Sequence, residues 1–158
     1  MKAIKANIVQ HLTVKEMTIS VAESCTGGSI ARLITQIPGA SVIFKGGIVA
    51  YDPEVKRQIL GIDAGILNGF GIVSRETAMG MALGCARLFK TDWAISTTGY
   101  AGPGGGDSAH PVGTVYIAIY SPRCQKSGIW KFRFEGTRKE IMKQASEQAL
   151  TQLNLMLS

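Results

Sequence analysis

Short apolar runs alternate with segments of helical periodicity along the first two-thirds of this chain, and this alternation constrains its fold more than any other feature. Strands separated by helices must be joined by crossovers, which place the helices on the faces of a parallel sheet. A strand pair and a last helix follow, so the sheet is expected to be mixed. Strands are predicted over 18–22, 48–51, 93–97, 113–120 and 129–134, and helices over 3–16, 28–36, 53–60, 74–89 and 138–157. The pattern predicts an α/β fold, a single three-layer α/β/α domain with a mixed β-sheet.

Length and composition favour one compact domain over residues 1–158. Of the 158 residues, 46% are hydrophobic and 18% are charged, and a chain of this size buries roughly 68–70% of the surface that it exposes when unfolded. Glycine-rich connections are predicted at 61–73 and 100–111. The first residues lack the apolar core of a signal peptide, and no segment approaches the ~20 apolar residues of a membrane span. We therefore expect a cytoplasmic protein without a membrane partner.

The formal net charge of +6 favours an anionic partner, with ordinary solubility as the alternative explanation of the charge. No run of Lys and Arg is longer than two residues, and the basic residues are scattered along the chain. This distribution favours a small anionic substrate over nucleic acid, with a DNA-associated protein as the alternative. Three widely spaced cysteines and two histidines predict neither a disulfide framework nor a metal site.

The stretch ESCTGG, residues 23–28, holds the densest group of reactive side chains and lies where a predicted strand passes into a predicted helix. Open α/β sheets tend to bind ligands at such strand ends. Free backbone N–H groups at the helix start, the helix dipole and two glycines would form an anion site at Thr26, Gly27 and Gly28. A plain capped turn is the alternative. Ser24 and Cys25 are both candidate nucleophiles, and the sequence does not choose between them.

A second candidate group, Tyr51, Asp52 and Lys56, follows the second predicted strand. Asp52 is predicted to cap a helix that begins at Pro53. Lys56 is then either a solvated lysine or, if it is buried near the helix N-terminus, a neutral amine with a lowered pKa that can act as a general base. Tyr51 fits either a half-buried core aromatic or a hydroxyl directed at a reacting centre.

The glycine-rich segment TTGYAGPGGG, residues 97–106, is the third candidate. Its position directly after a buried strand favours a binding loop over a flexible linker. Backbone amides in such a loop would polarise a carbonyl oxygen or hold a phosphate. Elsewhere, Cys85 is predicted to lie in the core and His110 to be a solvated loop residue.

Several blocks of the sequence closely resemble the CinA C-terminal domain family, whose enzymatic members are nicotinamide-nucleotide amidases. The resemblance covers nearly the whole chain, with the blocks in the same order. Many relatives carry a large additional N-terminal domain, and this chain resembles the stand-alone form. The matching blocks are AESCTGG (22–28), GGIVAYDPEVKRQILGI (46–62), GIVSRETAMGMA (71–82), TTGYAGPGGG (97–106) and PVGTVYIA (111–118).

The resemblance implies hydrolysis of the carboxamide of nicotinamide mononucleotide to nicotinate mononucleotide and ammonia. It implies no metal and no cofactor, and a homo-oligomer. Ser24 matches the family's nucleophilic serine, Lys56 its lysine partner and Tyr51 a tyrosine near the site. The residues expected to bind the substrate are Thr26, Gly27, Gly28, Thr98, Gly99, Gly102, Gly105 and Arg138.

Three positions depart from the usual pattern of the family: Tyr100 replaces an aliphatic residue, His110 a lysine and Thr137 an acidic residue. These departures leave Ser24 and Lys56 intact and bear on substrate preference and rate. An amide is a poor electrophile, so a serine hydroxyl that attacks it needs a base, and no histidine is suitably placed. A non-catalytic nucleotide-binding module of the same family is the alternative.

Overall fold

The computed structural model describes all of residues 1–158 and contains one five-stranded sheet with the strand order β2-β1-β3-β4-β5. The pairs β2–β1 and β1–β3 are parallel, whereas β3–β4 and β4–β5 are antiparallel. The predicted mixed sheet is therefore confirmed. The strands are β1 (Ile19–Glu23), β2 (Phe44–Val49), β3 (Trp93–Gly99), β4 (Thr114–Ser121) and β5 (Lys126–Arg133).

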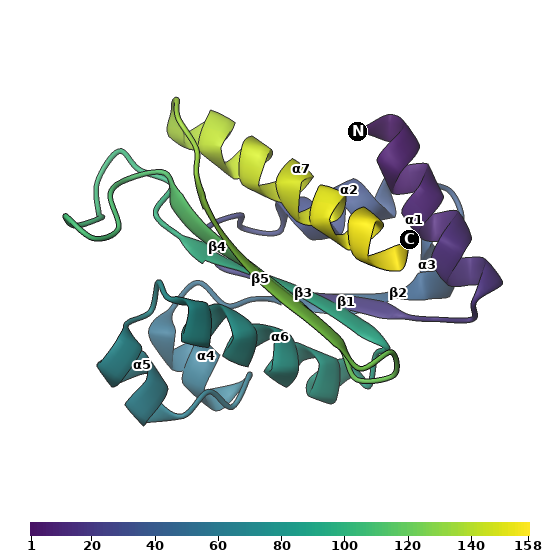
Figure 1. The fold of residues 1–158 in the computed structure, drawn as a ribbon, viewed down its shortest axis with the longest axis horizontal. Helices are drawn as coiled ribbons and strands as arrows, with labels where there is room; N and C mark the ends of the chain where they lie inside the picture. Colours follow the sequence, from purple (N-terminus) through teal and green to yellow (C-terminus); the bar gives the residue numbers. More distant parts are fainter.

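Helices cover both faces of the sheet and complete the predicted three layers. Figure 1 shows α1, α2, α3 and α7 on one face and α4, α5 and α6 on the other. The closing helix spans 138–157, as predicted. The helices are α1 (Lys2–Val14), α2 (Ser29–Thr35), α3 (Ala40–Ile43), α4 (Pro53–Gln58), α5 (Ala64–Phe70), α6 (Arg75–Phe89) and α7 (Arg138–Leu157). None of them is long and apolar enough to cross a lipid bilayer.

The central strands are buried on both faces, which explains why they appear in the sequence as continuous apolar runs. In β1, Val21 belongs to the core cluster under α1, α2, α3 and α7, whereas its neighbour Ala22 belongs to the cluster under α6. Cys85 packs in that second cluster and is fully buried, as predicted.

The order of the strands places a switch point at the carboxyl end of β1. From β1 the chain crosses through α2 and α3 to β2 on one side, and from β2 it crosses through α4, α5 and α6 to β3 on the other side. The two crossovers lie on opposite faces of the sheet (Figure 1). A crevice forms where neighbouring connections diverge in this way, and ligands bind there in open α/β sheets. The turn that begins at Ser24 lies at this point.

The prediction for β2 was wrong in its bounds, because the strand begins at Phe44 and includes both glycines that were expected to precede it. As an edge strand, β2 is only half-buried at alternate positions, so no apolar run marks its start. Gly47 pairs with Val21, and a Cβ atom at Gly47 would lie 2.7 Å from the carbonyl oxygen of Val21. The glycine therefore allows β2 to approach β1.

Two helices were not predicted. The segment 61–73 was expected to be a glycine-rich connection, but α5 lies within it, capped by the Asp63 carboxylate that accepts from the amide of Gly65. No residue of α5 is fully buried, so the helix leaves no apolar periodicity in the sequence. The other missed helix, α3, is a single turn.

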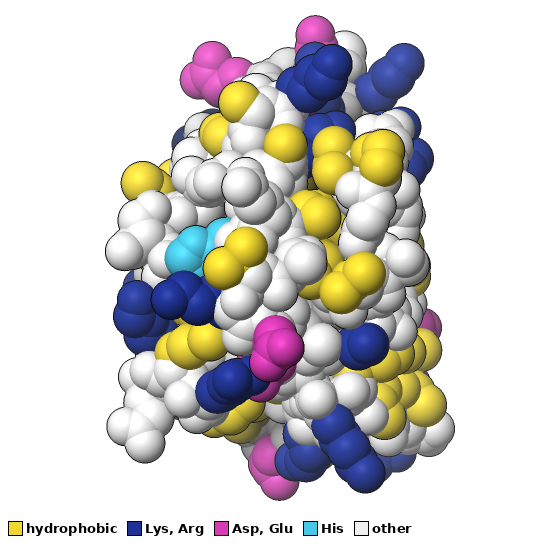
Figure 2. Space-filling model, turned by 90° about the vertical axis from the view of Figure 1, so that its right-hand side faces the viewer, with side chains coloured by type: hydrophobic (Ala, Val, Ile, Leu, Met, Phe, Trp, Pro, Cys, Tyr) yellow, Lys and Arg dark blue, Asp and Glu magenta, His cyan; other side chains and the backbone are white.

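The basic residues do not form one continuous surface on the face shown in Figure 2. Lys and Arg side chains lie apart there, separated by hydrophobic and uncharged side chains and interrupted by acidic ones. This pattern matches the scatter of basic residues along the sequence.

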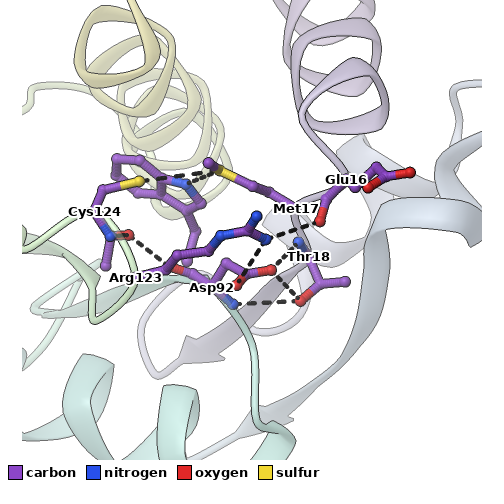
Figure 3. Close-up of polar contacts among 8 residues, drawn as sticks. Glu16, Met17, Thr18, Asp92, Arg123 and Cys124 are labelled. Carbon is purple, nitrogen blue, oxygen red and sulfur yellow. Dashed lines mark hydrogen bonds and ion pairs between the residues drawn. The ribbon is translucent and has the colours of Figure 1, made fainter.

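At the end of the sheet opposite the carboxyl end of β1, Asp92 links three connections (Figure 3). Its carboxylate accepts from the backbone amide of Thr18 at 2.8 Å and from the hydroxyl of Thr18 at 3.1 Å. Arg123, in the turn between β4 and β5, forms an ion pair with Asp92 at 3.5 Å and donates to the backbone carbonyl of Glu16 at 3.1 Å. The α1–β1, α6–β3 and β4–β5 connections are thereby held together.

Candidate active site

The hydroxyl of Ser24 and the amine of Lys56 lie 3.0 Å apart, although 32 positions separate them in the chain. Ser24 follows the last residue of β1, and its amide donates to the carbonyl of Thr97 in β3, which fixes it at the strand end. Lys56 extends from α4 and is only 1% exposed. The expected convergence of these two side chains is confirmed, and the interpretation of Lys56 as a solvated lysine was wrong.

The start of α4 determines where the Lys56 amine lies. The Asp52 carboxylate accepts from the amide of Glu54 at 2.7 Å, and Pro53 occupies the first helical position, so the helix begins where it was predicted. Lys56 thus stands within the first turns of α4, and its Nζ returns to the strand end to donate to the carbonyl of Ala50 at 2.6 Å. A longer contact of 3.4 Å joins Nζ to the carbonyl of Tyr51.

These contacts suit a neutral amine as well as an ammonium. A neutral amine can direct its two N–H groups to the carbonyls of Ala50 and Tyr51 and keep its lone pair for the proton of Ser24. Burial disfavours the charged form and lowers the pKa of Lys56 to about 8, with Asp52 opposing part of that shift. A neutral lysine is therefore within reach near physiological pH.

The structure separates the two candidate nucleophiles. Cys25 is buried, and burial raises the pKa of its thiol to about 12, so the thiolate that a cysteine nucleophile requires is disfavoured. Ser24, in contrast, has an amine at hydrogen-bond distance. A serine hydroxyl needs such a base to become a nucleophile, and the Cys25 thiol has no base at hydrogen-bond distance. The geometry therefore favours Ser24 as the nucleophile.

The predicted anion site at the start of α2 is wrong, because the protein's own Glu23 occupies it. One oxygen of the Glu23 carboxylate accepts from the amides of Gly28 and Ile30, at 3.0 and 3.1 Å. The same oxygen accepts from the hydroxyl of Thr26 at 2.6 Å, and the other oxygen accepts from the amide of Ala31 at 2.8 Å. These donors are consumed within the fold, and the turn that carries Ser24 is held in place.

A cleft of about 240 Å³ surrounds the Ser24–Lys56 pair. Six residues predicted for the site line it, whereas Thr26, Gly27, Gly28, Gly102 and Gly105 do not. Cys25, a candidate nucleophile, lines it too, as do Tyr100 and Ala101 of the predicted binding loop. Ile72 and Val73 complete the lining without having been predicted as site residues. The lining consists of Ser24, Cys25, Tyr51, Lys56, Ile72, Val73, Thr98, Gly99, Tyr100, Ala101 and Arg138.

Arg138 closes one side of the cleft by joining two segments. Its guanidinium donates to the carbonyl of Gly102 at 2.7 Å and to the hydroxyl of Tyr51 at 2.6 Å. Tyr51 is 58% exposed, so it is not the half-buried core aromatic that was one of its two interpretations. Gly102 thus contributes to the site through its carbonyl group, outside the cleft lining.

A hydrogen bond from Thr98 holds the segment of Ile72 and Val73 at the cleft. The Thr98 hydroxyl donates to the carbonyl of Ile72 at 2.7 Å, which draws the segment before α6 to the end of β3. Only the resemblance of block 71–82 pointed to this segment, because neither residue carries a reactive group. Ser74, next along the chain, caps α6 as predicted by accepting from the amide of Thr77.

The glycine-rich loop between β3 and β4 contains no helix or strand, as predicted. Gly105 faces the ring of Tyr100. His110 is less solvated than expected, because its side chain is 24% exposed and its Nε2 lies 3.2 Å from the hydroxyl of Tyr116. Nowhere in residues 1–158 do three His, Cys, Asp or Glu side chains group closely enough to hold a metal ion.

The fold and this cleft together define a three-layer α/β domain with a serine–lysine pair at the switch point of its sheet. The chain belongs to the CinA C-terminal domain family, whose model matches residues 1–157. A CinA-like protein of Gloeothece citriformis is 50% identical over 131 residues, which cover 83% of this chain and 31% of the relative. A CinA-like protein of Prochlorococcus marinus is 42% identical over 150 residues, covering 95% of this chain and 36% of the relative. The chain thus spans about a third of the length of these relatives.

Solved structures of similar size have the same fold. The competence/damage inducible protein CihA from Agrobacterium tumefaciens superposes with a TM-score of 0.94 at 36% identity, covering 98% of this chain and 93% of that protein. A CinA superfamily protein from Escherichia coli superposes with a TM-score of 0.90 at 29% identity, covering 96% of this chain and 88% of that protein. The family and the fold class inferred from the sequence are both confirmed.

Proposed function

We propose that this protein is an amidase that hydrolyses the carboxamide of nicotinamide mononucleotide to nicotinate mononucleotide and ammonia. The observation that carries the proposal is the 3.0 Å contact between the Lys56 amine and the Ser24 hydroxyl inside a cleft at the switch point of the sheet. Membership of the CinA C-terminal domain family, which includes amidases, supports the reaction class. Arg138, which lines the cleft, supports an anionic substrate.

In the first step, neutral Lys56 accepts the proton of Ser24 while the serine oxygen attacks the carboxamide carbon. The carbonyl oxygen gains negative charge and needs hydrogen-bond donors. The backbone amides of Cys25 and Ala101 are candidate donors, because both residues line the cleft and neither amide donates to another residue of the protein.

In the second step, the Lys56 ammonium returns the proton to the leaving nitrogen, the carbon–nitrogen bond breaks and ammonia departs. Ser24 is left as an ester of the nicotinate moiety. Neutral Lys56 then accepts a proton from water as the water oxygen attacks the ester, and the Lys56 ammonium returns that proton to Ser24 as the carbon–oxygen bond breaks. The product leaves as a carboxylic acid, which loses its proton to the released ammonia. The protein returns to its starting state with no other reactant consumed.

Ammonia release from nicotinamide mononucleotide tests the proposal directly. We expect wild-type protein to release ammonia, and Ser24→Ala and Lys56→Met to lose about 10³-fold or more of the rate, because each removes one member of a pair that acts as a unit. Cys25→Ala is the matched control, since it changes the neighbouring side chain and should keep most of the activity.

Other outcomes would contradict specific parts of the proposal. Equal ammonia release by wild type and Ser24→Ala would show that Ser24 is not the nucleophile. If Cys25→Ala alone were inactive, the thiol would be the nucleophile. Binding of nicotinamide mononucleotide without any ammonia release would instead support a non-catalytic nucleotide-binding module. Salt-dependent binding of duplex DNA would support the DNA-associated alternative.

A further inference from the structure

The active-site cleft is too small for a whole nucleotide. Its volume of about 240 Å³ lies below the roughly 300–1,000 Å³ that is common for small-molecule sites. A nucleotide whose carboxamide lies against Ser24 must therefore extend beyond the cleft. The amides at the start of α2 do not receive its phosphate, because Glu23 already occupies them.

A second cavity adjoins the cleft at Arg138 and has the charge that a phosphate requires. This cavity, the α2–α7 groove, has a volume of about 490 Å³ and four cationic side chains against one carboxylate. Arg138 lines both cavities, and α2 lies beside α7 in the fold (Figure 1). The lining consists of Ser29, Arg32, Leu33, Arg138, Lys139, Met142, Lys143, Ser146 and Glu147.

The cations of the α2–α7 groove are not neutralised within the protein. Arg32, Lys139 and Lys143 take part in none of the ion pairs of the structure, and Glu147 does not pair with Lys143 one turn away. These three side chains donate no hydrogen bond to the protein, and the hydroxyl of Ser29 also has no partner. The groove therefore offers several free donors to an anion.

Part of this charge arrangement is repulsive, although Glu140 and Glu147 lie three and four residues from Lys143 on α7. Lys139 and Lys143 are four residues apart on one helix, a spacing at which like charges repel. Arg138 and Lys139 also open α7, where positive charge opposes the helix dipole. At that helix start, the capping box satisfies the amides of Thr137 and Glu140. A bound anion would relieve the repulsion.

We propose that the α2–α7 groove binds the phosphate of the substrate, with Arg32, Lys139 and Lys143 as its ligands and Arg138 at the junction with the cleft. The identity of the substrate rests on the function proposed above, whereas the anion site rests on the groove itself. A phosphomonoester carries up to two negative charges and several acceptor oxygens, which match a group of lysine and arginine donors.

Substrates with and without a phosphate test this assignment. Ammonia release would be compared for nicotinamide mononucleotide and nicotinamide riboside in wild type and in the double variant Arg32→Gln/Lys143→Gln. We expect the KM for the mononucleotide to rise about tenfold or more in the double variant with little change in kcat, because charge-assisted contacts to the phosphate are lost. The preference for mononucleotide over riboside should fall by a similar factor. Lys15→Gln, which removes a lysine far from the groove, should keep that preference.

Titration with inorganic phosphate separates failure of this inference from failure of the proposed function. Calorimetry on the wild type should detect phosphate binding that the double variant loses, and this measurement does not depend on turnover. Equal phosphate affinity in both proteins, or no binding in either, would overturn the anion site. Phosphate should also compete with the mononucleotide and not with the riboside. Phosphate binding that leaves the KM for the mononucleotide unchanged would overturn the assignment to the substrate.

Discussion

At the scale of single residues, the buried amine of Lys56 links the proposed chemistry to pH. An ammonium inside the cleft loses most of its hydration, which lowers the pKa of Lys56 to about 8. The contacts of Nζ with Ala50 and Ser24 then determine how the protonated and the neutral amine interact with the serine hydroxyl. As an ammonium it donates to Ser24, and as a neutral amine it can accept the serine proton.

We therefore predict that kcat/KM for ammonia release rises with pH through about 8 and then levels off. Below pH 8 most Lys56 is protonated and cannot act as a base, so the rate should fall by about tenfold per pH unit. Above pH 8 the neutral form dominates. Initial rates between pH 6 and pH 10 would measure this profile. A flat profile, or a rate that falls as pH rises through 8, would rule out Lys56 as the base.

The residues of the site differ in how far the sequence revealed them. Ser24 and Lys56, the proposed catalytic pair, were named from segments that follow strand ends, whereas Arg138 was named only from the family resemblance. Thr26 and the two glycines after it were misassigned, because a sequence shows which amides are free at a helix start but not which side chain reaches them. Glu23 reaches them from the last position of β1, and its role follows only from the three-dimensional geometry.

At the scale of elements, α6 approaches the connection after α4 through a glycine. A Cβ atom at Gly84 would overlap the backbone carbonyl of Leu60. Gly69, in α5, faces no atom within 4 Å of the corresponding position. The two helical glycines therefore have opposite structural roles, since one allows close packing and the other allows only extra flexibility in the unfolded chain.

We predict opposite effects on stability when these glycines become alanine. Gly84→Ala should lower the free energy of unfolding by about 1–3 kcal/mol, because the backbone of Leu60 must move. Gly69→Ala should raise it by about 0.5 kcal/mol, because alanine is the better helix former. Denaturant unfolding would measure both. Stabilisation by Gly84→Ala would contradict the close approach of α6 to Leu60.

Elements with local start signals or two buried faces were predicted best. The caps at Asp52 and Ser74 mark helix starts that depend on side chain–backbone contacts between near neighbours, so the sequence contains them. The bounds of β2 and the whole of α5 depend on their places at the edge and on the surface of the molecule. Such elements lack a buried face, so hydrophobic periodicity does not mark them.

At the scale of the whole molecule, the two ends of the sheet, at opposite ends of its strands, have separate roles. The carboxyl ends of β1 and β3 bring Ser24 and Thr98 to the cleft, whereas the Asp92 contacts stabilise the opposite end of the sheet (Figure 3). Between these two ends, β1 and β3 are buried on both faces. A change at Asp92 should therefore affect folding more than the site.

We predict that Asp92→Ala lowers the free energy of unfolding by about 1–3 kcal/mol, because the amide and hydroxyl of Thr18 lose their acceptor. The kcat/KM per folded molecule should stay within about twofold of wild type. Glu135→Ala, which removes an exposed carboxylate without side-chain partners, should change neither quantity. Thermal unfolding and ammonia release would be measured on the same samples. A large loss of kcat/KM in folded Asp92→Ala protein would show that the two ends of the sheet are coupled.

The antiparallel pairing of β3 with β4 has a consequence for how the connection between these two strands can vary. Gly99 ends β3 opposite Val115 near the start of β4, so the connection over 100–113 leaves and re-enters the sheet at one place beside the cleft. Insertions and replacements in such a connection do not alter the pairing of the strands that carry it. Changes of this segment can therefore alter the cleft wall at Tyr100 and Ala101 while Ser24, Lys56 and the strand framework stay in place.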